Sequence, residues 1–401
     1  MYSIEALVRQ KVRVMKVVEV ILRAIRKEIT WIQAAEICGY SDRHMRRLRW
    51  RWEKKGYDGL MDRRSGRPRR RKIAIEVVRR VMELRREKYF DFNVAHFYEV
   101  ITGRYSIKMS YTYLKDLLQS SGLAERGTLK GKHRIRRERR AMRGMMLHMD
   151  GSSHNWLLLS PLEEKDLVVV ADDADGKILF GDFYEEEGTQ STFEALYHVI
   201  SRNGLFGELY TDRGSHMCYT RKASEGPDLS VDTQVQSALR TLRINLILGN
   251  SPQARGRSER VFETIQGRLP QELRAAGIKT WEAARHYLKT QFIPSFNKRF
   301  SVEPRDTKSA FIPYVGNDLK EVLSQHYERI VTNDNCVSFE GVTLQIPQSE
   351  FRNHFVKCRV QIHRYTDSSM AIFYGQHCLG RYASDGQLIT KKLQKKAESN
   401  E

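Results

Sequence analysis

The sequence predicts a multidomain protein with an all-α N-terminal part, a central α/β body and a small all-β C-terminal part. Apolar residues recur at helical spacing before residue 125, continuous strand-like runs begin at 145, and short alternating segments fill 327–390. A chain of 401 residues also exceeds the size of one ordinary hydrophobic core. We therefore expect several domains of different kinds.

The positive charge of the chain is concentrated at its N-terminal end. The net charge is +20, and residues 1–143 contain 38 Lys and Arg against 16 Asp and Glu, a balance of +22. The remainder has 31 against 33, a balance of −2. This asymmetry is typical of a nucleic-acid-binding arm joined to a separate functional body, and removing residues 1–143 should flatten the salt dependence of DNA affinity.

The cysteines and the apolar runs indicate the compartment. Five scattered cysteines give no paired spacing for a zinc site or a disulfide framework. The N-terminus lacks a signal-peptide pattern, and charged residues interrupt the longest apolar runs. We expect reduced thiols in a cytoplasmic, nucleoid-associated prokaryotic protein with no membrane partner.

The first helices carry a helix-turn-helix pattern. Residues 12–27 have helical spacing, and Thr30 with Gln33 predicts a capping box for a short helix that ends at Gly39. Ser41 or Asp42 can cap the next helix, DRHMRRLRWRWEKK. In that helix Met45, Leu48 and Trp52 share one face, which leaves Arg43, Arg46, Arg47 and Arg51 to face DNA. The alternative is a pair of solvated basic helices.

Two basic segments separate the predicted folded modules. Residues 56–72 are polar and glycine-rich, and their Arg67 and Arg69 could enter a minor groove or belong to an ordinary tether. A second helical module spans 73–125, and its last helix, capped at Ser110, resembles another helix-turn-helix reader. The run 126–143 that follows is either a solvated tether or a phosphate-binding segment through Arg136 and Arg137.

The body predicts a mixed sheet covered by helices. Strand-like runs MMLHMD, DLVVVADD and KILFGDFYEEE, the last two joined by a turn at Asp175-Gly176, precede a helix at 189–203. A strand GELYTD, a helix near 233–242, a strand INLILGN and two helices at about 253–276 and 281–298 complete the region. This order predicts a ribonuclease H-like α/β core, and the alternating segments at 327–390 predict a small β barrel.

The domain boundaries follow from these changes in pattern. We expect a helix-turn-helix DNA-binding domain at 1–60, a basic linker at 61–72, a second helical DNA-binding domain at 73–125, a basic linker at 126–143, a catalytic core at 144–305, a linker at 306–326, a small β-barrel domain at 327–390 and a polar tail at 391–401.

Three acidic residues predict a metal-dependent centre in the core. Asp150 and Asp212 each end a strand-like run, and Glu259 begins a helix-like run. Carboxylate oxygens are the ligands that hard divalent cations prefer, and phosphodiester chemistry uses two such ions about 4 Å apart. We predict that Asp150 bridges two Mg²⁺ (or Mn²⁺) ions, while Asp212 and Glu259 each complete one site.

Each of these residues also has a plain structural explanation. Asp150 could cap the turn at Gly151, Asp212 could belong to a turn before Gly214, and Glu259 could lie on a solvated helix face. The catalytic interpretation rests on the three together, in a chain that also carries a basic DNA-binding arm.

Neighbouring residues compete for roles at this centre. Glu263 lies one helical turn after Glu259 and is the alternative third carboxylate. His148 is better explained as a packed or hydrogen-bonded histidine than as a ligand, and His216 could touch DNA. The remaining candidates are Asp172, Asp173 and Asp175, explained by turn chemistry, and Arg255, Arg257 and Arg260, which could hold phosphate.

On these motifs the chain resembles the DDE transposases of the retroviral-integrase superfamily, most closely the ISNCY-type insertion-sequence transposases. The motifs are KKGYDGLMDRRSGRPR, HMDGS, YTDRGS and SPQARGRSERVFETIQGRL, and they extend over nearly the whole chain. The resemblance implies that Asp150, Asp212 and Glu259 are the catalytic triad, with Mg²⁺ or Mn²⁺ as cofactor. It also implies N-terminal binding of terminal inverted repeats and a homodimer or larger synaptic multimer. One departure is the 47-residue spacing from 212 to 259, with an additional stretch within 213–231.

The leading hypothesis is therefore a transposase that exposes 3′-hydroxyls at the ends of an insertion sequence and joins them to double-stranded target DNA. One alternative is a DNA-binding regulator or a domesticated transposase without catalysis. Another is a nuclease on the same fold, which would cleave without joining.

Overall fold

The computed structural model describes residues 4–61, 73–125, 138–160, 164–219, 231–249, 258–350 and 352–389. The chain divides into two compact units, residues 1–78 and 79–401. Across these described ranges, the helices are all too short or too polar to span a bilayer. The predicted domain boundaries within each unit remain predictions.

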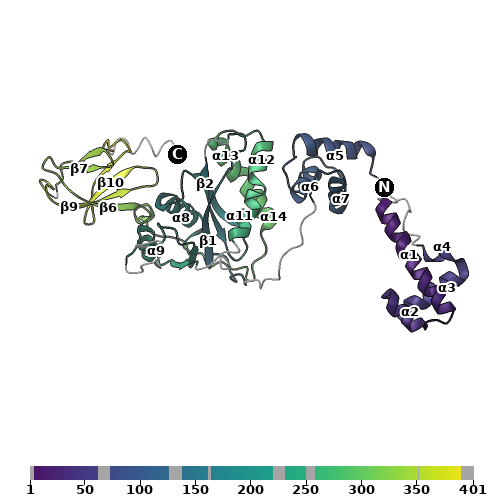
Figure 1. The fold of residues 1–401 in the computed structure, drawn as a ribbon. Coiled ribbons are helices and arrows are strands. Elements are labelled where there is room, and N and C mark those ends of the chain that lie inside the picture. Colours follow the sequence, from purple (N-terminus) through teal and green to yellow (C-terminus); the bar gives the residue numbers. More distant parts are fainter. Residues whose placement is uncertain are drawn as a thin grey trace. The chain divides into compact units, whose positions relative to one another are not determined.

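The described part of the first unit is a small helical bundle of α1 (Ile4–Ile25), α2 (Trp31–Cys38), α3 (Asp42–Lys55) and α4 (Tyr57–Leu60) (Figure 1). Thr30 caps α2, since its Oγ1 accepts the Gln33 N–H at 3.2 Å and its own N–H donates to Gln33 Oε1 at 2.9 Å. Gly39 ends α2 at φ +65°, and Ser41 caps α3 through the His44 N–H. These predicted caps are confirmed.

The bundle encloses one hydrophobic core, and α4 begins inside the segment predicted to be a linker. The core consists of Val17, Val20, Ile21, Ala24, Ala34, Ala35, Met45 and Leu48. A Cβ at Gly59 would lie 2.3 Å from the Arg51 carbonyl oxygen, so this glycine allows α4 to pack directly against α3. Residues 62–72 of the predicted linker lie outside the described residues.

A second helical module consists of α5 (Ile75–Glu87), α6 (Val94–Gly103) and α7 (Tyr111–Ser120). Ser110 caps α7 as predicted, and Asn93 caps α6 by accepting the His96 N–H at 2.8 Å. The buried apolar residues of this module include Val81, Leu84, Phe97, Leu114 and Leu118. The expected helical module is therefore present.

The core contains a five-stranded mixed sheet in the order β3-β2-β1-β4-β5. The strands are β1 (Met146–His154), β2 (Lys165–Asp172), β3 (Ile178–Tyr184), β4 (Glu208–Thr211) and β5 (Asn245–Leu248). The first three strands pair antiparallel, whereas β4 pairs parallel with both β1 and β5. The mixed sheet is as predicted.

Helices cover both faces of this sheet (Figure 1). They are α8 (Thr189–Asn203) and α9 (Gln234–Thr241) on one face, and α11 (Ser258–Gln266), α12 (Leu269–Ala275), α13 (Trp281–Tyr287), the π-helical turn Leu288–Phe292 and α14 (Ile293–Phe300) on the other. Along β2, Val168 and Val170 pack towards α8, while Leu167 and Val169 pack towards α11. This alternation assigns each strand residue to one face.

The aspartates at the β2–β3 hairpin do more than form a turn. Gly176 adopts φ +77° as the predicted hairpin turn requires, but Asp172, Asp173 and Asp175 are each only 1% exposed. Asp172 accepts the N–H groups of Gly144 and Ala174, each at 2.8 Å. Burial raises the pKa of Asp172, and these two amides oppose that shift. Turn chemistry alone is therefore an incomplete explanation.

These aspartates hold the described end of the basic run 126–143 against the sheet. Asp173 accepts the Arg140 N–H at 2.6 Å, and Arg143 Nε lies 3.2 Å from Asp175 Oδ2. The Arg140 guanidinium also pairs with Glu208. The expectation of a solvated tether is therefore wrong for residues 138–143, because buried carboxylates bind their arginines.

The C-terminal region is all-β, but its described strands do not close into the predicted barrel. After α15 (Leu319–Val322), the strands are β6 (Gln325–Ile330), β7 (Cys336–Phe339), β8 (Val342–Gln345), β9 (Arg359–Arg364), β10 (Met370–Tyr374) and β11 (His377–Tyr382). They form an open sheet of order β11-β10-β9-β6 and a separate β7-β8 pair. Within the described residues, β7 and β8 pair only with each other, and no strand joins β6 to β11. The outer side of β11 is bridged by Leu388 at Tyr382.

Candidate active site

Asp150 and Asp212 occupy matching positions on neighbouring strands. The parallel pairing of β1 and β4 aligns Met146 with Glu208 and His148 with Tyr210, so Asp150 and Asp212 stand two positions further along. Residues in matching register on parallel strands project to the same face. The structure therefore brings these two predicted ligands to one face of the sheet, where β4 ends beside β1.

The two carboxylates are held differently. Asp150 is 8% exposed and lies within β1, opposite Val169 of β2. Asp212 comes directly after β4, and its Oδ1 accepts the Gly214 N–H at 2.9 Å. The turn interpretation of Asp212 is thus correct as local structure, and its register with Asp150 is the additional observation.

Glu259 lies on the first turn of α11, as predicted. Phe262 and Ile265 anchor this helix in the hydrophobic cluster that contains Val169, whereas Glu259 and Glu263 are exposed. The Gln266 amide donates to Ser152 Oγ at 2.8 Å, which joins α11 to β1 two residues after Asp150. Glu259 precedes Gln266 by about two helical turns and projects from the same side.

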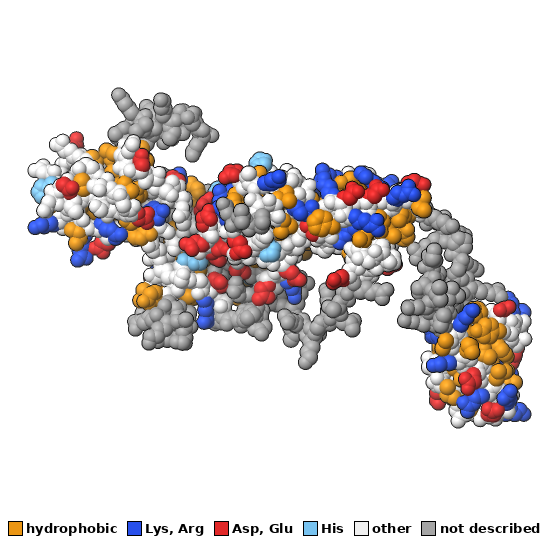
Figure 2. Space-filling view, turned by 45° about the horizontal axis from the view of Figure 1, so that its top comes forward, with side chains coloured by type: hydrophobic (Ala, Val, Ile, Leu, Met, Phe, Trp, Pro, Cys, Tyr) orange, Lys and Arg blue, Asp and Glu red, His pale blue; other side chains and the backbone are white. Residues whose placement is uncertain are grey.

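The three carboxylates do not form a closed ligand set. Across the described ranges, His, Cys, Asp and Glu side chains nowhere gather in a group of three or more that could hold a metal ion. Asp150 and Asp212 lie on the same face of the sheet, where β4 ends beside β1. Glu259 projects from a helix that packs on this face of β1. Figure 2 shows acidic side chains gathered on the surface of this central body.

Glu187 is an acidic neighbour that the sequence interpretation missed. Its side chain lies over Gly151, where an added Cβ would be 2.1 Å from Glu187 Oε2. Its other carboxylate oxygen, Oε1, is 3.7 Å from His216 Nε2. The glycine directly after Asp150 was the available signal, since glycine often marks a close approach.

The two histidines near the site are both largely buried. His148 Nε2 lies 2.7 Å from Asp173 Oδ1, and its ring is 5.0 Å from the Tyr210 ring, which confirms the hydrogen-bonded interpretation. The His216 side chain is 10% exposed, and burial lowers its pKa against the opposing charge of Asp212. His216 therefore points inward from the loop that carries Asp212.

The arginines proposed to bind DNA are exposed where they are described. Arg43, Arg46, Arg47 and Arg51 of α3 all face solvent, and Arg46 pairs with Asp42. Figure 2 shows basic and hydrophobic side chains side by side on the first unit, which contains α3. Arg67, Arg69, Arg136, Arg137, Arg255 and Arg257 lie outside the described residues.

The second helical module is fastened to the helix that follows α11. Arg268 donates two hydrogen bonds of 2.8 Å to the Glu99 carboxylate, and Arg274 binds Asp91 at 2.6 and 2.7 Å. His96 Nε2 also lies 2.9 Å from Glu272 Oε1. Planar guanidinium groups match carboxylates in this paired geometry, so the module docks through oriented ion pairs.

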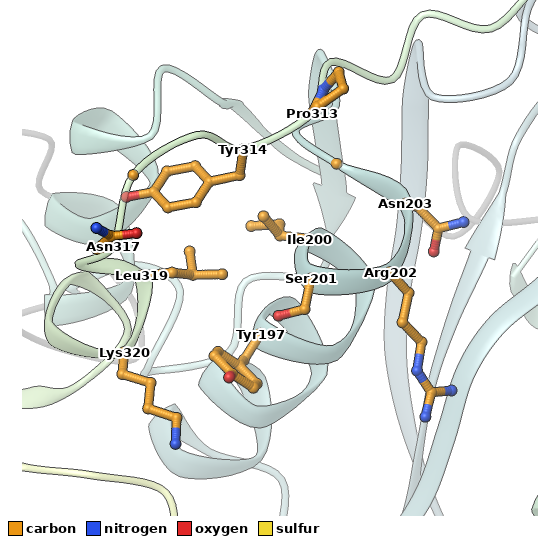
Figure 3. Close-up of a pocket in the computed structure, with 12 residues that line it drawn as sticks. Tyr197, Ile200, Ser201, Arg202, Asn203, Pro313, Tyr314, Asn317, Leu319 and Lys320 are labelled. Carbon is orange, nitrogen blue, oxygen red and sulfur yellow. The ribbon is translucent and has the colours of Figure 1, made fainter.

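A cavity of about 500 Å³ lies away from the acidic residues, at the C-terminal end of α8. In Figure 3 the side chains of Ile200, Tyr314 and Leu319 point towards one another between α8 and the segment after Pro313. Glu187 instead precedes the N-terminal end of α8. The cavity is therefore separate from the candidate active site.

Comparison with known proteins identifies relatives over most of the chain. Residues 20–76 match the winged helix-turn-helix family model. A Sinorhizobium fredii protein named transposase y4bF is 28% identical over 369 residues, which cover 90% of this chain and 79% of that protein. The transposase for insertion sequence IS1202 of Streptococcus pneumoniae is 26% identical, and the match covers 75% of this chain and 71% of the relative.

Solved integrase structures also match, with low TM-scores. The catalytic core domain of HTLV-2 integrase in complex with magnesium has a TM-score of 0.28 at 16% identity, covering 38% of this chain and 90% of that one. A simian T-cell lymphotropic virus intasome has a TM-score of 0.33 at 12% identity, covering 68% and 88%. The assignment of class therefore depends on the sequence relatives and on the elements described above.

The helix-turn-helix unit and these relatives confirm that the chain is similar to transposases over most of its length. Within that class, the similarity to the IS1202 protein links the chain to the transposases of insertion sequences. The more specific ISNCY-type assignment stays a prediction.

Proposed function

We propose that this protein is a DNA transposase that binds the terminal inverted repeats of an insertion sequence, exposes their 3′-hydroxyls and joins them to target DNA. The observation that carries the proposal is the matched register of Asp150 and Asp212, with Glu259 on the helix that packs against β1. Asp150, Asp212 and Glu259 are the proposed catalytic triad.

The donor chemistry of these residues fits a divalent metal. Asp150 and Asp212 place carboxylate oxygens, the preferred ligands of Mg²⁺ and Mn²⁺, on the same face of the sheet where β4 ends beside β1. Glu259, or Glu263 in its place, lies on an exposed helix face where it is free of core packing. Two bound ions would activate the attacking oxygen and stabilise the leaving oxygen. Asp150, Asp212 and Glu259 would hold these ions.

The joining reaction exchanges one phosphodiester bond for another. The 3′-hydroxyl oxygen of the element bonds to a target phosphorus, and the bond from that phosphorus to the target's 3′ oxygen breaks. The proton of the attacking hydroxyl is lost, and the departing target oxygen gains one. No cofactor that supplies energy is needed, so the task of the protein is to position the two DNA strands.

The N-terminal modules would supply the DNA affinity. The exposed arginines of α3 can neutralise phosphates, and the first turns of that helix can reach base edges in the major groove. The proposed DNA contacts also include Arg67, Arg69, Arg136, Arg137, Arg255 and Arg257. A homodimer or larger multimer would bring two element ends together.

Metal-dependent chemistry on labelled DNA tests the proposal against its alternatives. The substrate carries the sequences that flank the gene, and Asp150→Asn is compared with Asp367→Asn, which changes an exposed aspartate of the β region. Cleavage and joining that are lost only in Asp150→Asn support a transposase. Specific binding without cutting supports a regulator or a domesticated transposase, and cleavage without joining supports a nuclease.

A further inference from the structure

Glu187 lies in the connection from β3 to α8, and its backbone is fixed at both ends. Its N–H donates to Asp166 Oδ2 of β2 at 2.8 Å. The next residue, Gly188, donates its N–H to Ser191 Oγ at 2.9 Å as α8 begins. Hydrogen bonds therefore hold the main chain at Glu187 to β2 and to the first turn of α8.

The Glu187 side chain occupies the space that a side chain at position 151 would take. A Cβ on Gly151 would lie 2.1 Å from Glu187 Oε2, 2.6 Å from Cδ and 3.2 Å from Cβ. Gly151 is not among the glycines with positive φ, so its conformation alone does not require glycine. An alanine at position 151 would therefore require the Glu187 carboxylate to move.

On its other side Glu187 meets the loop that carries Asp212. Its Oε1 lies 3.7 Å from His216 Nε2, a packing contact longer than a hydrogen bond, with the two side chains 19% and 10% exposed. A Cβ on Gly214 would lie 2.8 Å from His216 Cε1 and 3.2 Å from Asp212 Oδ1. The His216 ring and the Asp212 carboxylate therefore flank the same glycine.

We propose that Glu187 and His216 form a positioning pair that holds the Asp212 loop against the backbone that follows Asp150. The pair connects the two segments whose carboxylates must keep a constant separation to hold metal. The consequence for metal affinity rests on the proposed function, whereas the consequence for the loop does not. Neither residue of the pair contacts the reacting DNA in this account.

Amide hydrogen exchange of the full chain, without metal or DNA, tests the loop directly. In Glu187→Ala, peptides covering residues 212–218 should exchange about tenfold faster, which corresponds to about 1.4 kcal/mol. Glu186→Ala removes the exposed neighbouring carboxylate and should leave this exchange unchanged. If Glu187→Ala unfolds the protein, Glu187→Gln preserves the side-chain volume and carries the same test. Wild-type exchange of the loop in a folded variant overturns the proposal.

Calorimetric titration with Mn²⁺ alone tests the consequence for the site. Partners that orient metal ligands typically contribute about 10- to 100-fold in affinity, so Glu187→Ala and His216→Ala should each weaken Mn²⁺ binding by at least about tenfold. The double variant should bind no more weakly than the weaker single variant, because one pair is removed. Additive losses, or unchanged affinity in Glu187→Ala, contradict a shared positioning role.

The controls separate this inference from the proposed function. Absence of Mn²⁺ binding that depends on Asp150 in the otherwise unchanged protein contradicts the proposed function. The exchange experiment still decides whether Glu187 holds the loop. If Mn²⁺ binding depends on Asp150 but is the same in Glu187→Ala, the proposed function survives and the positioning pair is wrong.

Discussion

Asp150 in β1 and Asp212 just after β4 occupy matching register positions, two residues beyond the parallel pair of His148 and Tyr210. Strand β4 ends at Thr211, so Asp212 leaves the sheet while Asp150 stays paired with β2. One carboxylate is thus fixed by the sheet, and the other by a turn closed through Gly214. The distance between the two carboxylates therefore depends on the contacts that fix the turn at Asp212.

Gly151→Ala should damage both folding and joining. The added methyl group would lie 2.1 Å from Glu187 Oε2, so the carboxylate must move or β1 must shift. Overpacking costs about 1–3 kcal/mol of unfolding free energy in a well-packed core, and we expect the lower end of that range here because the Glu187 side chain is flexible. Urea unfolding and a joining assay check the prediction. Gly188→Ala in the adjoining connection meets no atom within 4 Å and should behave as wild type in both.

Arg268→Ala should loosen the second helical module from the core. The Arg268 and Glu99 side chains are 10% and 19% exposed and share two hydrogen bonds. The substitution removes both hydrogen bonds from a Glu99 carboxylate that water reaches poorly. Breaking a buried pair costs about 3–5 kcal/mol when the remaining charge has no partner, and we expect a smaller loss here because Arg299 still pairs with Glu99. Arg305→Ala removes a pair that is 67% and 84% exposed and should cost less than about 1 kcal/mol in the same urea unfolding. Equal losses would contradict the docking role.

Glu321 should make the C-terminal region sensitive to acid. Burial alone would raise the pKa of Glu321, but hydrogen bonds from His363, Tyr365 and Arg381 outweigh it and lower the pKa from 4.5 to about 2. A carboxyl group with a depressed folded-state pKa stabilises the fold above its ordinary pKa and loses that contribution as the pH falls. Stability should therefore fall between about pH 4.5 and pH 2.

Glu321→Gln provides the check on this acid sensitivity. Thermal unfolding should show a lower midpoint at neutral pH and a flatter pH dependence below about pH 4.5 than in wild type. Glu328→Gln alters a pair whose side chains are 59% and 76% exposed, and it should retain the wild-type profile. An unchanged profile in Glu321→Gln would show that the three hydrogen bonds do not stabilise the fold.

The arginines of α3 should contribute to the salt dependence of DNA binding. Arg43, Arg47 and Arg51 recur every four residues on the exposed face of the helix. If each neutralises one phosphate, replacing all three by Ala should reduce the slope of log affinity against log salt by about 2 to 3. Fluorescence anisotropy over a salt series measures this slope. An unaltered slope would place the DNA-binding surface elsewhere, and Arg305→Ala serves as the single-charge control.

Local chemistry explains why much of the fold was predictable. Thr30, Ser41 and Ser110 cap their helices by hydrogen bonds to residues three positions away, so a short stretch of sequence contains the whole interaction. The alternation of buried residues along β2 likewise indicates a strand covered on both faces. The acidic pair was predictable because both residues end apolar strand-like runs.

Contacts between distant segments account for what the sequence did not reveal. Arg268 binds Glu99 across 169 positions, and neither residue stands in a pattern that indicates the other. Glu187 was missed because it lies in the connection from β3 to α8 while Gly151 lies in β1, and its position over Gly151 is visible only in the folded chain. The alternating C-terminal segments indicated strands, but alternation carries no information on whether a sheet closes.

The most direct test incubates the purified protein with labelled DNA that carries the sequences flanking its gene, in the presence of Mg²⁺ or Mn²⁺, beside Asp150→Asn and Asp367→Asn. The account predicts metal-dependent exposure and joining of 3′-ends by wild type and Asp367→Asn, and loss of both in Asp150→Asn with nearly unchanged end binding. Normal strand transfer by Asp150→Asn would contradict the assignment of the acidic site.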